Sequence, residues 1–183
     1  MSILDKIKKF FSVHSDLRDF LIDLAVGLAA VAVIMVVLYA YAGTWPPIVS
    51  IMSDSMTPHM DKGDLVILQG IQITGVHTKD NASGNYTMFD EPGDVIIYHP
   101  YGFTNLTPVI HRAVGYVHQG DPMWPGGPSA PWDGYITRGD ANPVVDQEAQ
   151  NICYLEPVKK EWIIGTARYR IPYVGYIRAL LPV

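Results

Sequence analysis

Residues 20–42, FLIDLAVGLAAVAVIMVVLYAYA, form the most hydrophobic stretch of this sequence of 183 residues. Asp23 is the only charged residue in this stretch. With a rise of about 1.5 Å per residue, a helix of this length extends ~35 Å, which is enough to cross a hydrocarbon core of ~30 Å. The stretch therefore predicts one transmembrane helix near the N-terminus.

The end of the apolar stretch also allows a second interpretation. Ala40-Tyr41-Ala42 has the small-x-small pattern of a signal-peptide cleavage site, which would make the stretch a removable signal sequence. The apolar run is longer than the ~7–15 residues typical of such sequences, and we therefore favour a retained membrane anchor.

The charges on either side of the apolar stretch predict its orientation. Four basic residues precede residue 20, whereas the segment 43–62 contains only Lys62. The positive-inside rule then places residues 1–19 in the cytoplasm as an N-terminal segment and residues 43–183 on the other side of the membrane. We expect three parts: this segment, the transmembrane helix 20–42 and an extracytoplasmic domain.

The overall composition excludes several classes of protein. Hydrophobic residues make up 49% of the chain and charged residues 17%, which excludes a disordered chain. The formal net charge of −5 argues against nucleic acid as a partner, because such binding needs a basic surface. Cys153 is the only cysteine, so the chain cannot form an intramolecular disulfide or a CxxC zinc or redox site.

The segment 43–183 has the composition of a β domain. It holds all 14 prolines and 15 of the 16 glycines, a density of helix breakers that excludes long helices. Short runs with strand character lie between these breakers, at 64–69, 71–76, 94–98, 108–117, 135–138 and 161–170. We expect a mainly β protein: a compact antiparallel β domain behind one N-terminal transmembrane helix, with surface loops at 77–92 and 120–134.

A candidate nucleophile follows the membrane segment, in the stretch 48–60, IVSIMSDSMTPHM. An apolar strand leads here into two serines, Ser53 and Ser55, just before Pro58. A serine hydroxyl is a weak nucleophile unless a base removes its proton. Taken alone, the pattern is more often a turn whose hydroxyls bind backbone groups.

Candidates for the base and for an orienting acid lie further along the chain. His111 lies inside the strongest predicted strand, where backbone pairing would fix its ring, whereas the other five histidines lie at turns or before the membrane helix. Asp140 and Asp146 flank an Asn-Pro turn. A serine, a strand-borne histidine and a carboxylate meet the requirements of a Ser-His-Asp hydrolase, but the residues alone do not choose between the two aspartates.

Four segments, in this order, resemble the motifs of type I signal peptidases. They are Ser53-Asp54-Ser55-Met56-Thr57-Pro58 followed by Lys62-Gly63-Asp64-Leu65-Val66, then Gly93-Asp94-Val95-Ile96-Ile97-Tyr98, Val109-Ile110-His111-Arg112, and Gly139-Asp140-Ala141-Asn142 with Asp146. Bacterial members of the family carry a lysine where this chain has His111. The sequence is therefore similar to the archaeal and endoplasmic-reticulum branch, and the likeness extends from the membrane helix to about Thr166.

The resemblance implies a role for each site residue. Ser55 would be the nucleophile, His111 the general base and Asp146 the acid that orients it, with Asp140 in support. The backbone N–H of Ser55 and the hydroxyl of Ser53 would form the oxyanion hole. Asp54 stands where the family commonly has glycine, and its charge disfavours an oxyanion unless it points to solvent or to a cation. The histidines and acids show no HExxH or similar ligand spacing, so we expect no metal and no cofactor.

The function implied by the resemblance is a membrane-anchored serine endopeptidase that removes signal peptides from secretory preproteins through an acyl-enzyme. It would work at the outer surface of the cell membrane or in the endoplasmic-reticulum membrane, with preprotein signal peptides, membrane lipids and the secretion translocon as partners. By analogy with the family, the substrate would lie extended against the strands 64–69 and 108–111. A membrane-anchored β domain that only binds is the alternative. Self-cleaving repressor-type proteases share a related β fold, but they are soluble and use a lysine base.

Overall fold

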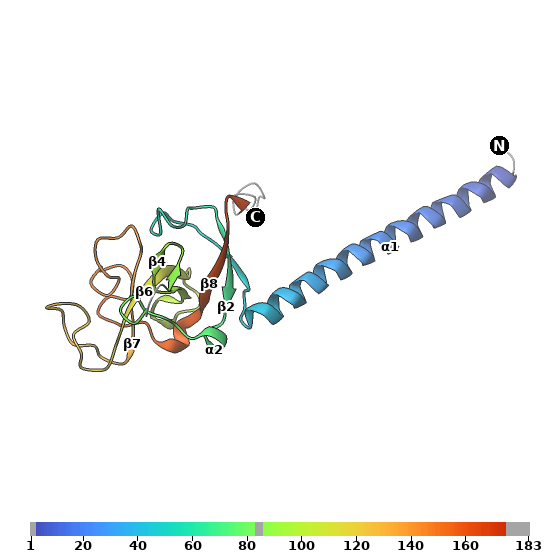
Figure 1. Cartoon of the computed structure of the whole chain (residues 1–183). Coiled ribbons are helices and arrows are strands. Elements are labelled where there is room, and N and C mark those ends of the chain that lie inside the picture. The colour runs from blue at the N-terminus through green and yellow to red at the C-terminus, as the bar shows by residue number, and fades with distance from the viewer. Residues whose placement is uncertain (1–2, 83–85, 175–183) are drawn as a thin grey trace. The chain divides into compact units, whose positions relative to one another are not determined.

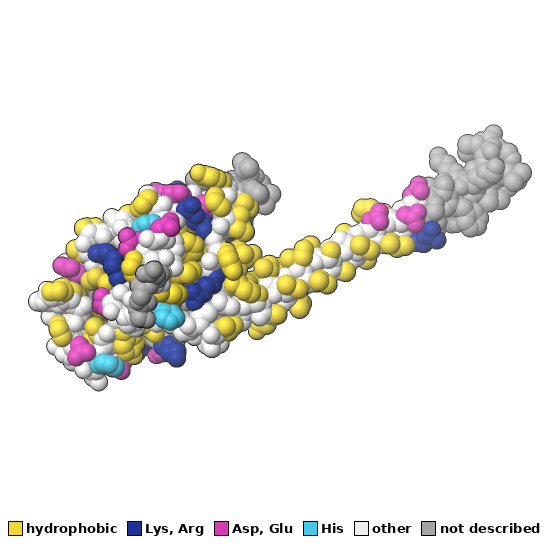
Figure 2. Space-filling view, viewed as in Figure 1, with side chains coloured by type: hydrophobic (Ala, Val, Ile, Leu, Met, Phe, Trp, Pro, Cys, Tyr) yellow, Lys and Arg dark blue, Asp and Glu magenta, His cyan; other side chains and the backbone are white. Residues whose placement is uncertain are grey.

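The computed structural model describes residues 3–82 and 86–174, with side chains from Asp16 onward, and divides into two compact units, Met1–Tyr41 and Ala42–Val183. The described part of the first unit is helical and belongs to α1, Ile3–Ala42 (Figure 1). Its part Asp16–Ala42 is long and apolar enough to cross a membrane. Hydrophobic side chains cover this part of the helix surface (Figure 2), as a helix surrounded by lipid requires.

The second unit is built around a six-stranded antiparallel sheet, with the strand order β1-β2-β8-β5-β6-β7. Its strands are β1 Ile48–Ser50, β2 Leu65–Gln69, β5 Val95–Tyr98, β6 Val109–Val117, β7 Gly134–Arg138 and β8 Ile163–Ile171. The smaller elements are helix α2 Ile71–Thr74, strands β3 Thr87–Met88 and β4 Glu91–Pro92, and the 3-10 turns η1 Pro100–Gly102 and η2 Lys160–Trp162. The expected fold class, a mainly antiparallel β protein with one N-terminal apolar helix, is confirmed.

The core of this unit lies on both faces of strand β5, whose four residues are all buried. Val95 and Ile97 pack in one hydrophobic cluster, which also holds Leu68. Ile96 and Tyr98 pack in a second cluster on the other face. A strand buried on both faces carries a continuous apolar run instead of an alternating one, and this explains the sequence Val-Ile-Ile-Tyr.

The segment 71–76, expected to be a strand, instead begins with the short helix α2. Gly70 and Gly75 bracket this single turn, and Gly75 has φ +67°, a backbone conformation that glycine adopts without strain. The N–H of Gly70 binds the carbonyl of Ala42, and the side-chain amide of Gln72 binds the carbonyl of Gly43. No residue of α2 is fully buried, so its alternating pattern does not reflect a buried sheet face.

The described part of the segment 77–92, expected to be a loop, contains a small hairpin of β3 and β4. Its turn residues, Phe89 and Asp90, have φ of 54° and 64°. Two positive φ values in succession are typical of a type I′ turn, whose central residues are usually Asn-Gly or Asp-Gly. This turn has Phe-Asp instead, so the local sequence does not predict the hairpin.

Strand pairing limits where an extended peptide can join the sheet. β2 pairs with β8 along its whole length and with β1 at Leu65–Ile67, so the expected contact of a substrate with the strand 64–69 is wrong over these paired residues. In β6, by contrast, β7 pairs only with Arg112–Val117. Among the described strands, none pairs with the corresponding edge of Val109–His111, and this stretch remains open for backbone hydrogen bonds.

Candidate active site

The turn that carries Ser55 is closed by the backbone and anchored in the core. The N–H of Ile51 binds the carbonyl of Asp64, and the N–H of Gly63 binds the carbonyl of Ile51, which joins the two ends of the loop. Met56, directly after the serine, is 1% exposed and packs in the core, as does Met60. A surface serine between such anchors has a fixed backbone position.

Ser55, His111 and Asp146 lie in a continuous hydrogen-bonded row, although they come from three distant parts of the chain. The Oγ atom of Ser55 lies 3.0 Å from Nε2 of His111. The Nδ1 atom of the same ring lies 2.6 Å from Oδ2 of Asp146. The histidine and aspartate side chains are 3% and 1% exposed, so water does not compete for their hydrogen bond.

The chemistry of the partners fixes the direction of each hydrogen bond. An ionised carboxylate only accepts, so Nδ1 of His111 carries the proton that it donates to Asp146. The Nε2 atom then keeps its lone pair and accepts the hydroxyl hydrogen of Ser55. This is the tautomer that a general base needs, and the buried carboxylate also stabilises the imidazolium that forms when the base takes a proton.

Two further donors hold the carboxylate of Asp146. The hydroxyl of Tyr98 donates to its Oδ2 at 2.9 Å, and the hydroxyl of Thr137 donates to the same atom at 2.7 Å. Burial, together with the nearby charge of Asp146, raises the pKa of Tyr98 well above its ordinary value, so this phenol keeps its proton. With the histidine N–H, the carboxylate accepts three hydrogen bonds, which balances the cost of burying its charge.

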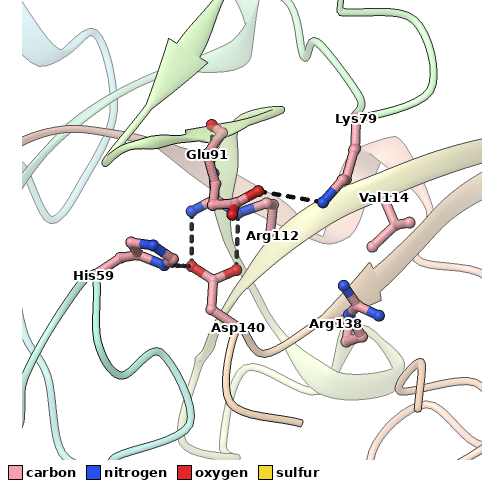
Figure 3. A pocket seen from close by; sticks show the side chains of 7 residues that line it. All are labelled: His59, Lys79, Glu91, Arg112, Val114, Arg138 and Asp140. Atoms are coloured by element: carbon pink, nitrogen blue, oxygen red, sulfur yellow. Dashed lines mark hydrogen bonds and ion pairs between the residues drawn. The ribbon is translucent and has the colours of Figure 1, made fainter. Parts of the chain in front are cut away.

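Asp140 occupies a separate site. Its carboxylate accepts two hydrogen bonds from the guanidinium of Arg112, at 2.8 and 2.7 Å, and one from Nδ1 of His59 at 2.8 Å (Figure 3). Burial alone would raise the pKa of Asp140, but Arg112 and His59 lower it below its ordinary value. Among the described residues, no hydrogen bond joins Asp140 to His111, so the structure brings Asp146 to the histidine and keeps Asp140 apart.

The loop that follows β7 touches the nucleophile through its backbone. The N–H of Ala141 donates to the carbonyl of Ser55 at 2.9 Å. A Cβ atom on Gly139 would lie 2.6 Å from that carbonyl oxygen and 2.9 Å from Nε2 of His111, closer than real contacts allow. Glycine is therefore required here, because the loop backbone packs directly against the serine and the histidine.

The expected oxyanion donors lie beside the nucleophile. The hydroxyl of Ser53 is 3.1 Å from that of Ser55. Within the described part of the chain, the backbone N–H of Ser55 has no hydrogen-bond partner and remains available to a ligand. Asp54, between the two serines, is exposed. Its carboxylate is therefore screened by water, which reduces its repulsion of a developing negative charge.

The sequence predicted no role for five residues of this site, although three of them lie in the motifs quoted above: Tyr98, Arg112, Gly139, Thr137 and His59. The sequence held a weak signal for the first, because a tyrosine at the end of an apolar, buried strand needs a partner for its hydroxyl. The others depend on which strands become neighbours, and a single strand does not reveal this. In the described ranges, no group of three or more His, Cys, Asp or Glu side chains is placed to hold a metal ion.

No protein-family model matches the chain, but it is similar to several curated proteins. It is 29% identical over 161 residues to the signal peptidase complex catalytic subunit SEC11 of Arthroderma otae, covering 79% of this chain and 71% of that protein. It is 30% identical over 137 residues to the subunit of the same name from Pyricularia oryzae, covering 74% and 63%. The Candida albicans subunit is 24% identical over 172 residues, covering 93% and 86%. The resemblance that the sequence motifs indicate is confirmed.

Proposed function

We propose that this chain, a homologue of signal peptidase catalytic subunits, is a membrane-anchored serine endopeptidase that removes signal peptides from secretory preproteins. The main observation that supports this proposal is the hydrogen-bonded row of Ser55, His111 and Asp146. A nucleophile at 3.0 Å from a base, and the base at 2.6 Å from a buried carboxylate, meet the geometric requirements of a catalytic triad. A β domain that only binds would not need this arrangement.

The reaction proceeds in two steps of acyl transfer. The Oγ atom of Ser55 attacks the carbonyl carbon of the scissile peptide bond while Nε2 of His111 accepts the hydroxyl proton. The tetrahedral intermediate collapses, and His111 gives this proton to the leaving amine. The signal peptide remains bound to Ser55 as an ester. His111 then deprotonates a water molecule that attacks the ester, and returns the proton to Ser55 as the serine leaves.

The developing oxyanion is stabilised by the N–H of Ser55 and the hydroxyl of Ser53. Both donors belong to the turn that holds the nucleophile, so the attacked carbonyl oxygen meets them without rearrangement of the chain. One donor of this kind typically contributes ~2.7–4 kcal/mol to transition-state stabilisation. Asp140 acts at a distance, by holding the loop backbone that binds the Ser55 carbonyl.

The membrane helix determines which substrates reach the site. A signal peptide is itself an apolar segment held in the bilayer, and its cleavage point emerges at the membrane surface. Ser55 follows Ala42, the last residue of α1, by only thirteen residues. We assign the chain to the cell membrane or the endoplasmic-reticulum membrane as a single-pass protein with a cytoplasmic N-terminus. Membrane lipids and the secretion translocon are its expected neighbours.

The open edge of β6 is the place for the substrate backbone. Val109 and Ile110 directly precede the base, so a peptide paired with them extends toward Ser55 and His111. Backbone hydrogen bonds of this kind hold many different sequences in one extended conformation, as an enzyme that processes many preproteins requires. Side-chain selection then falls to the pockets next to the scissile bond.

Cleavage of a secretory precursor by the purified chain in detergent tests this function. Wild-type protein should produce a single new N-terminus at the signal-peptide boundary, identified by sequencing of the product. Ser55→Ala and His111→Ala should each lower kcat/KM by about 10⁴-fold or more while the folded domain is retained. Activity should also fall on acidification, because a protonated imidazole cannot accept the serine proton. Wild-type cleavage rates in either variant would favour the binding module instead.

A further inference from the structure

The turn that carries Ser55 also carries a histidine, His59, which is distinct from the base His111. His59 follows Ser55 by four residues, and its Nδ1 atom donates to Oδ2 of Asp140 at 2.8 Å. The side chains of His59 and Asp140 are only 18% and 8% exposed, so this hydrogen bond is largely shielded from water. The pair lines a small cavity with Arg112 and Arg138 (Figure 3).

The turn is linked to side chains on both faces of strand β6, directly on one face and through Asp140 on the other. Side chains alternate along a strand, so His111 and Arg112 point in opposite directions. Ser55 bonds to His111 on one face. His59 bonds to Asp140, and Asp140 bonds to Arg112 on the other face.

On the second face, Asp140 and Arg112 are held by several hydrogen bonds. Asp140 holds Arg112 through two hydrogen bonds, and Nη1 of Arg112 donates to three carbonyls of the adjacent hairpin and its exit, those of Met88, Glu91 and Gly93. His59 is fixed from its backbone as well, because its carbonyl accepts from Nη1 of Arg170 at 2.8 Å. The imidazole of His59 thus joins the turn to a part of the sheet that cannot shift easily.

We propose that His59 is a positioning residue for the reaction, and that its hydrogen bond to Asp140 sets the distance between the Ser55 hydroxyl and the His111 ring. This inference rests on the proposed peptidase function. Among the hydrogen bonds of the described residues, one other joins the turn to the same loop, from the N–H of Ala141 to the carbonyl of Ser55. Met56 and Met60 hold the backbone of the turn in the core, so loss of the His59 link should shift the Ser55 hydroxyl only slightly against the His111 ring.

The expected consequence is a loss of catalytic rate with little loss of substrate binding. The substrate backbone binds at the edge of β6, which His59 does not touch. Displacement of a nucleophile by about 1 Å can lower the rate by ~100-fold, because attack requires close and aligned atoms. We therefore expect His59→Leu, which keeps the bulk but removes the donor, to lower kcat by about 10- to 100-fold with KM almost unchanged.

The test compares His59→Leu with His59→Asn in the full-length chain, using cleavage of one secretory precursor in detergent. The side-chain N–H of asparagine can take the place of the imidazole Nδ1–H, so His59→Asn should restore most of kcat. The rate of labelling of Ser55 by a fluorophosphonate probe should follow kcat in both variants. Thermal unfolding of each variant gives the folded fraction, to which the rates are normalised.

A matched control is His77→Leu. His77 also bonds through Nδ1 to an aspartate, Asp94, at 3.3 Å, but it does not belong to the nucleophile turn, and this variant should cleave like wild type. Wild-type kcat per folded molecule in His59→Leu, or a loss that His59→Asn does not rescue, would overturn the inference. Ser55→Ala tests the function separately: if it cleaves like wild type, the proposed peptidase itself is wrong.

Discussion

The two aspartates of the loop after β7 carry the same charge but lie among different partners. Asp146 accepts from His111, Tyr98 and Thr137 and is 1% exposed. Asp140 accepts from a guanidinium and a second histidine. The first set of donors leaves the carboxylate free to stabilise a positive imidazolium, whereas the second already neutralises it with Arg112.

Substitution of each aspartate by asparagine separates these two roles. Asp146→Asn should lower kcat by about 10⁴-fold, because the amide no longer fixes the reactive tautomer of His111 or stabilises its charged form. Asp140→Asn leaves Arg112 without its anion, so it should lower the free energy of unfolding by about 3 kcal/mol. It keeps an acceptor for His59, and kcat per folded molecule should fall far less. Steady-state kinetics and urea unfolding measure both quantities, and equal losses of kcat would give the aspartates a shared role.

Residue types and their order predicted the candidate triad. They left the choice between the two aspartates open, and the resemblance to the family implied Asp146. Ser55, His111 and Asp146 were predicted from the local context of each residue and from the resemblance to a family. Nothing in the residues near Asp140 indicates that Arg112, on another strand, neutralises it. Such a pairing depends on strand register, here Arg112 opposite Arg138, which the sequence of one strand does not encode.

Strands with a strong apolar signal were predicted from the sequence, whereas the short connecting elements were not. β5 carries a run of β-branched residues, β6 begins with Val109-Ile110, and both strands lie close to the expected positions. The run at 71–76 has the same composition, yet its first four residues form α2, because the bracketing glycines and the contacts of Gly70 decide its local conformation. Tertiary contacts override propensity where an element is only one turn long.

The loop after β7 makes a prediction at the scale of an element. In Gly139→Ala the new methyl group would meet the Ser55 carbonyl, a backbone atom that cannot move without shifting the turn. We expect the Ser55–His111 distance to increase and kcat to fall by about 100-fold or more. In the control Gly115→Ala, the methyl group would meet Oδ2 of Asp80 at 2.8 Å, and this side chain can rotate away. A Gly139→Ala enzyme as active as Gly115→Ala would mean that the loop does not support the turn.

At the scale of the whole molecule, labelling of the single cysteine measures how far the domain is unfolded. Cys153 is fully buried in the second core cluster, and burial raises the pKa of its thiol from 9.0 to about 11. The folded state thus favours the neutral thiol, and the free energy of unfolding should decrease as the pH rises from 9.0 toward about 11.

At pH 8 a thiol reagent should therefore neither label the folded protein quickly nor inhibit cleavage of a precursor. Labelling in increasing urea, followed by mass spectrometry, should rise together with global unfolding. Rapid labelling in native buffer would show that the second core cluster opens locally. Inhibition that accompanies such labelling would show that cleavage depends on the intact second core cluster, which also holds Tyr98.

The chain also has a direction across the membrane, and the proposed function depends on it. Lys6, Lys8, Lys9 and Arg18 precede the apolar segment, against Lys62 alone in the residues 43–62. Basic residues near a span are retained on the cytoplasmic side, so this imbalance predicts that the β domain is outside. In sealed right-side-out vesicles of the cell membrane, added protease should digest the domain and spare a tag at the N-terminus.

A variant with Lys6, Lys8 and Lys9 changed to glutamine tests the cause of this orientation. It leaves Arg18 before the span and Lys62 after it, within residues 1–62. The difference in basic charge on which the positive-inside rule depends is then absent. We expect a mixture of orientations in the same protease assay, and a loss of precursor processing in proportion to the inverted fraction. Uniform protection of the β domain in the wild-type vesicles would place Ser55 on the cytoplasmic side, where the cleavage points of translocated preproteins do not emerge. A signal peptidase could not work from there, whatever the geometry of its triad.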